Sequence, residues 1–251
     1  MNKNLISFFS LLIILISCSN KKNDLKKANL FGKVKFVKEI NYEAVEKFGE
    51  IVEGYTLHTY ESTYDEKGNL IKWCRESETF LEGIICTEYN VDEKGNQIGI
   101  TYNSQNNIKY KLVRNYDSNG KEIESNSYDK NNNLTTKVKS ELDKNGNAIK
   151  DRMYNSYGNL ESVTERKFDK NGNCIEAISK TNTDVIFQKW EEQMYDKFNN
   201  LINWKLTIPS SRTVHFEHKF EFDKNNNWIR QVILQDQKPE TVIKREIKYR
   251  N

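Results

Sequence analysis

The residues able to do chemistry in this sequence are few and scattered. Its histidines are His58, His215 and His218. The last two lie three positions apart in a stretch that alternates like a strand, so they face opposite sides and cannot share a metal ion without a bulge. The sequence contains no glycine-rich phosphate loop, nucleophile elbow or paired-carboxylate pattern. It therefore predicts no catalytic residue, no metal site and no cofactor.

Two short stretches are similar to the start of a calcium-binding loop. They read Asp-Lys-Asn-Gly-Asn and begin at Asp143 and Asp169. In both, the glycine comes two places too early, and Tyr154 and Lys180 stand where such a loop needs its closing glutamate. We therefore interpret both stretches as ordinary turns.

The tryptophans offer a second kind of chemistry, which is the stacking of sugar rings. In strands, aromatic side chains more often fill a core or form cross-strand pairs, and we expect that role here. The four residues are Trp73, Trp190, Trp204 and Trp228.

Three cysteines lie beyond residue 20, at Cys74, Cys86 and Cys174. A hairpin centred near Thr79 or Phe80 would pair positions whose numbers add to 160, and this places Cys74 opposite Cys86, within reach of a disulfide. Cys174 would then stay a thiol. In the alternative all three are small apolar fillers, because a shift of one residue in the turn separates the pair.

A turn motif repeated seven times sets the phase of the chain that positions these residues. Its first copy runs Tyr64-Asp65-Glu66-Lys67-Gly68-Asn69-Leu70-Ile71. The aspartate can accept a hydrogen bond from a backbone N–H two residues on, and glycine or asparagine tolerates positive φ. The turn-defining residues are Asp65 and Gly68, Asp92 and Gly95, Asp117 and Gly120, Asp143 and Gly146, Asp169 and Gly172, Asp196 and Asn199, and Asp223 and Asn226.

The motif recurs every 25 to 27 residues, and a second turn falls halfway through several repeats. In the second turn, as at Tyr102 and Ile108, the aliphatic residue comes six places after the aromatic one. In the first it comes seven places after, as from Tyr64 to Ile71. Paired residues of a hairpin share a face, so we expect four-residue loops at one edge of the sheet and three- or five-residue loops at the other.

The segments between turns alternate apolar and polar residues, which is typical of strands. The sequence therefore predicts an all-β fold, a long antiparallel meander of roughly 15–16 strands built from tandem repeats of about 26 residues, each a double hairpin. A sheet this wide curls or twists, and the sequence leaves open whether it closes on itself. We expect the last strand to be an edge, guarded by Lys244, Arg245, Lys248 and Arg250.

The N-terminus has the pattern of a targeting segment. Lys3 precedes an apolar run from Leu5 to Ile16, which is too short to span a bilayer comfortably, so residues 1–17 are interpreted as a signal peptide. Leu15-Ile16-Ser17-Cys18 resembles the lipobox of bacterial lipoproteins, and this resemblance implies that Cys18 becomes the lipidated first residue. The alternative is an ordinary secretory signal. Residues 18–30 are expected to form a flexible polar tether.

From about Glu61 onward the repeat resembles the Tyr-Asp repeat of bacterial RHS proteins, which runs Tyr-Asp-x-x-Gly followed by Asn or Arg and then Leu. That family builds long β-hairpin sheets that curl into shells, and residues 31–251 would form such a repeat domain. The unit here is longer, and the chain is too short to enclose a toxin as the large members do. The resemblance thus implies a fold and a bacterial envelope setting, with no catalytic residue.

The charge balance and the N-terminal targeting segment limit the classes of function that we expect. With Lys3 removed, 38 basic residues stand against 36 acidic ones, so nothing favours nucleic acid as a partner. We expect a non-enzymatic lipoprotein, anchored by its lipid to the outer membrane, with its periplasmic side favoured over the cell surface. Its β surface would bind an envelope protein or a glycan, or act as a scaffold. The alternative is an envelope enzyme or an accessory protein of toxin secretion with an unrecognised site.

Overall fold

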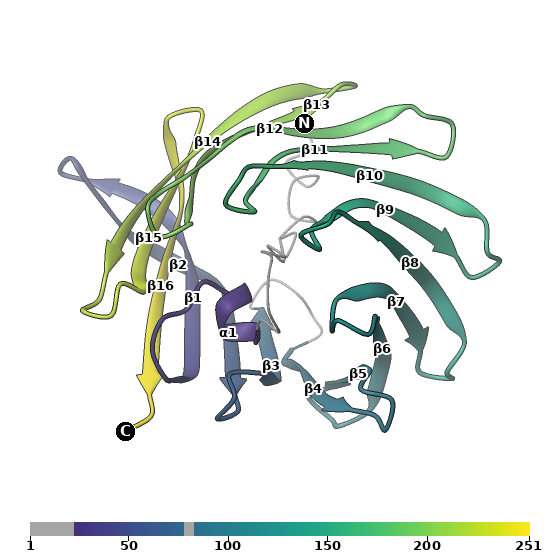
Figure 1. Ribbon diagram of the computed structural model, residues 1–251. Coiled ribbons are helices and arrows are strands. Elements are labelled where there is room, and N and C mark those ends of the chain that lie inside the picture. The colour runs from purple at the N-terminus through teal and green to yellow at the C-terminus, as the bar shows by residue number, and fades with distance from the viewer. Residues whose placement is uncertain (1–22, 78–82) are drawn as a thin grey trace.

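The computed structural model describes residues 23–77 and 83–251, and there the chain forms a closed antiparallel β-barrel (Figure 1). Each strand pairs with the next in sequence and the last pairs with the first, so the expected all-β meander is confirmed. The strands are β1 (Val34–Lys47), β2 (Glu50–Tyr64), β3 (Leu70–Ser77), β4 (Ile85–Val91), β5 (Gln97–Asn103), β6 (Ile108–Tyr116), β7 (Glu122–Asp129), β8 (Leu134–Leu142), β9 (Ala148–Asn155), β10 (Leu160–Phe168), β11 (Cys174–Thr181), β12 (Ile186–Tyr195), β13 (Leu201–Ile208), β14 (Arg212–Phe222), β15 (Trp228–Gln235) and β16 (Lys238–Tyr249).

One carboxylate organises each Tyr-Asp turn. Oδ1 of Asp65 accepts hydrogen bonds from the backbone N–H groups of Lys67 and Asn69, both at 2.8 Å, and Oδ2 accepts from the Asn69 amide at 2.9 Å. Gly68 has φ +81°, and this left-handed conformation reverses the direction of the chain. All seven turn-defining Gly and Asn positions have positive φ: Gly68, Gly95, Gly120, Gly146, Gly172, Asn199 and Asn226.

At the other end of the barrel, the turns at Asn103, Asp129 and Asn155 have the same geometry, whereas the β1–β2 and β15–β16 turns have two residues and the β13–β14 turn has three. Asn103 accepts from the N–H groups of Gln105 and Asn107, as Asp65 does at its own turn, and Asn106 takes φ +60°. The expected four-residue loops are therefore wrong, because the Tyr-Asp turns also have five residues between the paired positions, as the turn at Asn103 does.

The error came from taking the isoleucine as the partner of the tyrosine. Tyr64 in fact pairs with Leu70, six places on, just as Tyr102 pairs with Ile108. Ile71 falls at a bulge, because the next pair is Thr63 with Lys72. A bulge adds a residue to one strand and breaks simple parity counting.

The inner face of the barrel is identified by the short helix α1 (Asp24–Lys27), which lies within the ring of strands (Figure 1). Leu25 of this helix is buried in a cluster with Val37 and Tyr64, so these two side chains point inward. Paired residues share a face, and the registers carry this assignment around all sixteen strands. Lys72 and Cys74, for example, point outward.

The segment expected to be a flexible tether is partly structured. Residues 23–30 form α1 and its flanks, with Leu25 and Leu30 each 7% exposed, so for these residues the expectation is wrong. Two leucines five positions apart give a polar segment enough apolar surface to dock inside the barrel. Residues 1–22, with the signal peptide and Cys18, lie outside the described residues.

The C-terminal strand is not an edge. β16 pairs with β1 over its length, with Lys38 opposite Glu246 and Tyr42 opposite Val242. Arg245, expected to guard an edge, points inward and binds Glu39 at 2.9 Å. A barrel satisfies both edges by closure and so needs no guard.

Beyond this seam, the end of the β1–β2 hairpin bends over the outer face of β15 and β16. Glu53 forms ion pairs with Arg230 and Lys244, at 3.5 and 3.1 Å. Ile51 helps cover Val242, which is fully buried. Among the described residues, the buried apolar side chains form two small clusters, one inside beneath α1 and one outside beneath this hairpin.

The turn geometry predicts a graded effect on stability within one loop. Gly146 has φ +81°, and a Cβ there would meet the side chain of Lys121. Gly146→Val should therefore lower the free energy of unfolding by about 1–2 kcal/mol or more, measured in denaturant melts.

Lys144→Ala is the matched control, because Lys144 is exposed in the same loop and should change stability by less than about 0.5 kcal/mol. Equal losses in the two variants would contradict the turn assignment.

Candidate functional site

Aromatic side chains line the inner face of one half of the barrel. Trp204 stacks on Phe216 with ring centroids 4.2 Å apart, and the Arg245 guanidinium lies 3.2 Å from the centre of the Trp228 ring. All four tryptophans face inward and are half-buried, so of the two expected roles they do not fill a closed core. The cross-strand pairing is found at Trp204, and Trp73 stacks on Tyr60 of the neighbouring strand. The partial exposure of these rings means that water reaches the interior.

His218 is part of this wall. The Trp204 indole N–H donates to His218 Nε2 at 3.2 Å, and the Gln231 side-chain amide lies 3.0 Å from Nδ1. An indole can only donate, so Nε2 accepts and Nδ1 carries the proton, which the amide oxygen of Gln231 can then accept. Burial lowers the pKa of His218 to about 4. The imidazole is therefore neutral and structural at pH 7.

The interior also holds buried charge next to α1. Glu122 lies beside Arg114, 3.7 Å away, and burial nevertheless raises the pKa of Glu122. Burial and the Glu122 charge likewise raise the pKa of Tyr116. In the part of the chain that the structure describes, no three metal-binding side chains come together.

An open pocket of about 790 Å³ lies at the barrel end opposite the Tyr-Asp turns. It sits between the β9–β10 and β11–β12 turns and is lined by Asn155, Asn159, Leu160, Glu161, Thr181 and Asn182. The side-chain oxygen Oδ1 of Asn155 holds the turn by accepting from the backbone N–H groups of Tyr157 and Asn159, both at 3.0 Å. The polar groups of this pocket are amides, a hydroxyl and one carboxylate.

Large exposed side chains lie near the pocket-lining residues in sequence. Tyr157, at the tip of the β9–β10 turn, is 87% exposed, and Phe187 on β12 is 39% exposed. Sequence reasoning treated Asn155 and Tyr157 only as a turn. The available signal was a bulky aromatic residue at a tip position that holds Lys, Asn or Gln in most of the other turns, with Phe198 and Thr183 as the exceptions.

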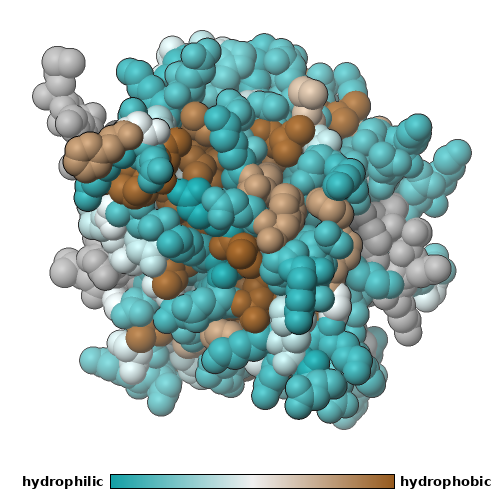
Figure 2. Space-filling view, turned by 90° about the vertical axis from the view of Figure 1, so that its left-hand side faces the viewer, coloured by the Kyte–Doolittle hydropathy of each residue, from teal (hydrophilic) through white to brown (hydrophobic). Residues whose placement is uncertain are grey.

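The outer wall of the barrel carries charge on most strands. Outward-facing ion pairs bridge neighbouring strands, such as Lys72 with Glu88 at 3.1 Å and Lys150 with Glu165 at 2.9 Å. Others are Lys38–Glu61, Lys137–Glu124, Arg152–Glu141, Lys180–Glu165, Lys167–Glu176, Lys205–Glu191 and Arg230–Glu221. Figure 2 shows one side of this wall as mainly hydrophilic, with hydrophobic side chains interspersed.

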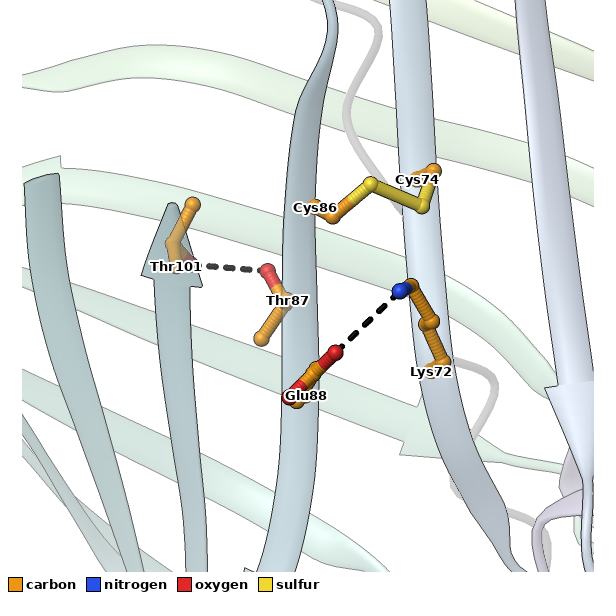
Figure 3. Close-up of a disulfide and its surroundings, with 6 residues drawn as sticks. All are labelled: Lys72, Cys74, Cys86, Thr87, Glu88 and Thr101. Atoms are coloured by element: carbon orange, nitrogen blue, oxygen red, sulfur yellow. Dashed lines mark hydrogen bonds and ion pairs between the residues drawn. A yellow bond between two sulfur atoms is a disulfide. The ribbon is translucent and has the colours of Figure 1, made fainter. Parts of the chain in front are cut away.

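Cys74 and Cys86 form a disulfide on this outer wall (Figure 3). They are paired residues of β3 and β4, and Lys72 pairs with Glu88 in the same register, so both pairs add to 160. The turn itself, with Thr79 and Phe80, lies outside the described residues. Cys174 is a buried thiol on the inner face, and burial raises its pKa.

Thiol counting checks this arrangement in solution. The oxidised Cys18→Ser protein, unfolded in denaturant, should expose one reactive thiol, that of Cys174. Three reactive thiols would contradict the bridge. Reduction should lower the free energy of unfolding by about 2–3 kcal/mol, as expected for a short closed loop.

His218 predicts a pH dependence of stability. Its folded pKa of about 4 lies below its ordinary value of 6.5, so the unfolded chain binds the extra proton between these pH values. The stabilisation is complete above pH 6.5 and is lost as the pH falls toward 4, by on the order of 1–3 kcal/mol. Denaturant melts of the parent should show this slope, and His218→Gln should flatten it. An equal slope in both proteins would contradict the assignment.

The chain is similar to known proteins in fold and not in sequence. No protein-family model and no curated protein matches the chain. Among solved structures, it is similar to a porin-like protein from Bacteroides uniformis, with 8% identity, a TM-score of 0.58, and coverage of 86% of this chain and 98% of the other. A porin-like protein from Bacteroides vulgatus has 13% identity, a TM-score of 0.48 and the same coverage. The first likeness shows that this chain has the β-barrel fold of that structure.

Proposed function

We propose that this protein is a lipid-anchored, non-catalytic binding protein of the bacterial envelope that holds a glycan at the rim of its barrel. The observation that carries the proposal is the pocket between the β9–β10 and β11–β12 turns. Amide and hydroxyl side chains there, from Asn159, Thr181 and Asn182, match the donors and acceptors of sugar hydroxyls. The exposed ring of Tyr157 offers the apolar surface on which a sugar face can stack.

The charged outer wall supports an anchored barrel whose outside is in water. A barrel that crosses a membrane presents an apolar outward band about 25 Å tall. Cross-strand ion pairs such as Lys72–Glu88 and Lys150–Glu165 interrupt such a band. None of the described helices is long and apolar enough to span a bilayer. The porin-like neighbour and the lipobox-like Cys18 are both consistent with an envelope protein.

The pKa values of the carboxylates favour a binding role over catalysis. Among the described residues, Glu122 is the one carboxylate whose pKa is raised, and it sits in the interior beside Arg114. An enzyme that uses acid–base catalysis would hold two carboxylates with shifted pKa values in one cleft. The resemblance of the turns to the Tyr-Asp repeat of bacterial RHS proteins is a prediction from sequence. It supports the bacterial envelope as the location in this proposal.

Glycan binding can be tested on an array of neutral and acidic oligosaccharides, followed by titration of the best binder. Tyr157→Ala and Asn159→Ala should each weaken that binding about five- to tenfold, which corresponds to about 1–1.4 kcal/mol, by removing the stacking ring and an amide.

Tyr55→Ala is the matched control, because Tyr55 is an exposed tyrosine on β2, 59% accessible and outside the pocket lining. It should bind as the parent does. Binding lost equally in all three variants, or no binding on the array, would sink the glycan assignment.

A further inference from the structure

Six inward-facing aromatic side chains form one connected row on β13, β14 and β15. We call this row the aromatic track, and its members are Trp204, Phe216, His218, Phe220, Phe222 and Trp228. Beyond the stack of Trp204 on Phe216, the ring centroid of Phe220 lies 6.2 Å from His218, 5.8 Å from Trp228 and 6.1 Å from Phe222. All six side chains are half-buried, so part of each ring is in contact with water inside the barrel.

The track ends at the N-terminal segment, at the barrel end that carries the Tyr-Asp turns. The ring of Phe222 lies 5.2 Å from that of Phe198 in the β12–β13 turn, and Phe198 meets Phe31 edge-on at 6.3 Å. Phe31 is fixed there, because its N–H donates to Asn227 Oδ1 at 2.7 Å and its carbonyl accepts from the Asn227 amide at 2.9 Å. A ligand on the track therefore meets the chain itself at this end.

At its other end the track approaches the pocket of the proposed function. Thr181 lines that pocket, and its pairing with Ser162 places it on the inner face of β11. On the next strand, β12, Trp190 also faces inward and pairs with Leu206, two positions from Trp204. Inward-facing side chains thus lead from the pocket to the track without crossing to the outer wall.

The inner face of β7 to β10 has a different chemistry, because many of its side chains are hydroxyls. They are Ser125, Ser127, Thr136, Ser140, Ser162 and Thr164. A sugar has apolar ring faces that stack on aromatic rings and hydroxyl groups that hydrogen-bond to such side chains. An acyl chain would instead remove these hydroxyls from water without offering them a hydrogen bond, which costs free energy. The two inner walls together favour a sugar over a lipid.

Charge favours a neutral sugar over an acidic one. Two of the inward-facing arginines are already matched by carboxylates: Arg166 by Asp151 at 2.7 Å, and Arg245 by Glu39 at 2.9 Å. The charged residue in the pocket lining is Glu161, and its carboxylate repels a negatively charged sugar.

We infer that the aromatic track extends the rim pocket, and that the ligand is a neutral, linear oligosaccharide that lies in the pocket at one end and along the track at the other. The inference rests on the glycan of the proposed function and adds the charge and the length of that glycan. Phe216 and Phe222 are six residues apart on β14, which is about 20 Å along the strand. The track can therefore stack several successive sugar rings beyond those that the pocket holds.

The length of the ligand is tested by calorimetric titration with a series of neutral oligosaccharides that share one repeating unit, chosen from the best binder on the array. The parent should bind the hexasaccharide at least tenfold more tightly than the disaccharide, because only the longer chain reaches the track. Equal affinities along the series would overturn the track as a sugar site. Tighter binding of an acidic series of the same lengths would overturn its preference for neutral sugars.

Substitutions at Trp204 test the track directly. Trp204→Leu removes the stacking ring and should weaken hexasaccharide binding at least fivefold while leaving disaccharide binding unchanged, whereas Trp204→Phe keeps a ring and should bind both as the parent does. Phe220→Leu repeats the test at a second position of the track. The matched control is Trp73→Leu, a half-buried inward tryptophan on β3, six strands from β13 around the barrel, which should change neither affinity. Equal effects of Trp204→Leu and Trp73→Leu would contradict a specific role for the track.

Two outcomes separate this inference from the proposed function. Binding that depends on Tyr157, yet gains nothing from chain length or from Trp204, leaves the rim pocket in place and refutes the track; binding of no oligosaccharide at all refutes both. A fatty acid provides the competing occupant. If palmitate changes the fluorescence of the parent but not of Trp204→Phe, and the hexasaccharide does not displace it, the track holds an apolar ligand and the inference is wrong.

Discussion

The hydrogen bonds that one side chain makes inside each five-residue Asp or Asn turn determine much of the rest of this structure. A carboxylate or amide at the first corner, as at Asp65 or Asn103, accepts from two backbone N–H groups and fixes the loop at both ends of every such hairpin. A fixed loop fixes the register of the strands that leave it, and the register decides which side chains face inward. Ten of the described turns have this side chain, and the fifteen sequential pairings bring β16 back to β1, where the barrel closes.

Closure allows a thin wall to be stable with little conventional core. Val34 and Val242 are fully buried, but they belong to two small and separate clusters. Most other side chains contact water on one face of the sheet, and they interact with cross-strand partners through stacking, ion pairs or the Cys74–Cys86 bridge. Since the backbone hydrogen bonds of every strand are satisfied by two neighbours, no edge has to be covered.

The sequence predicted the parts of the structure that depend on local chemistry. The positions of the turns, the periodicity of the strands and the pairing of Cys74 with Cys86 follow from neighbouring residues. The bulge at Ile71 was missed because parity counting assumes a regular ladder. The docking of Leu25 and the burial of Arg245 depend on contacts with residues more than 40 and more than 180 positions away, at Gly68 and Tyr64. The pocket was missed for the same reason, because its walls come from two turns that only the barrel brings side by side.

Closure of the sheet gives the molecule an inside, an outside and two distinct rims. Lys38 of β1 and Glu246 of β16 are paired on the outer face, 208 positions apart in sequence. In the Lys38→Cys, Glu246→Cys double variant, a thiol cross-linker about as long as one strand spacing, about 5 Å, should join the two strands in the folded protein. The same cross-linker should not join Lys38→Cys to Lys180→Cys on β11, which is ten strands along the sheet from β1 in one direction and six in the other. Efficient cross-linking of the first pair alone supports the barrel. Failure of that pair to cross-link in folded protein would mean that the sheet is open and that the account is wrong.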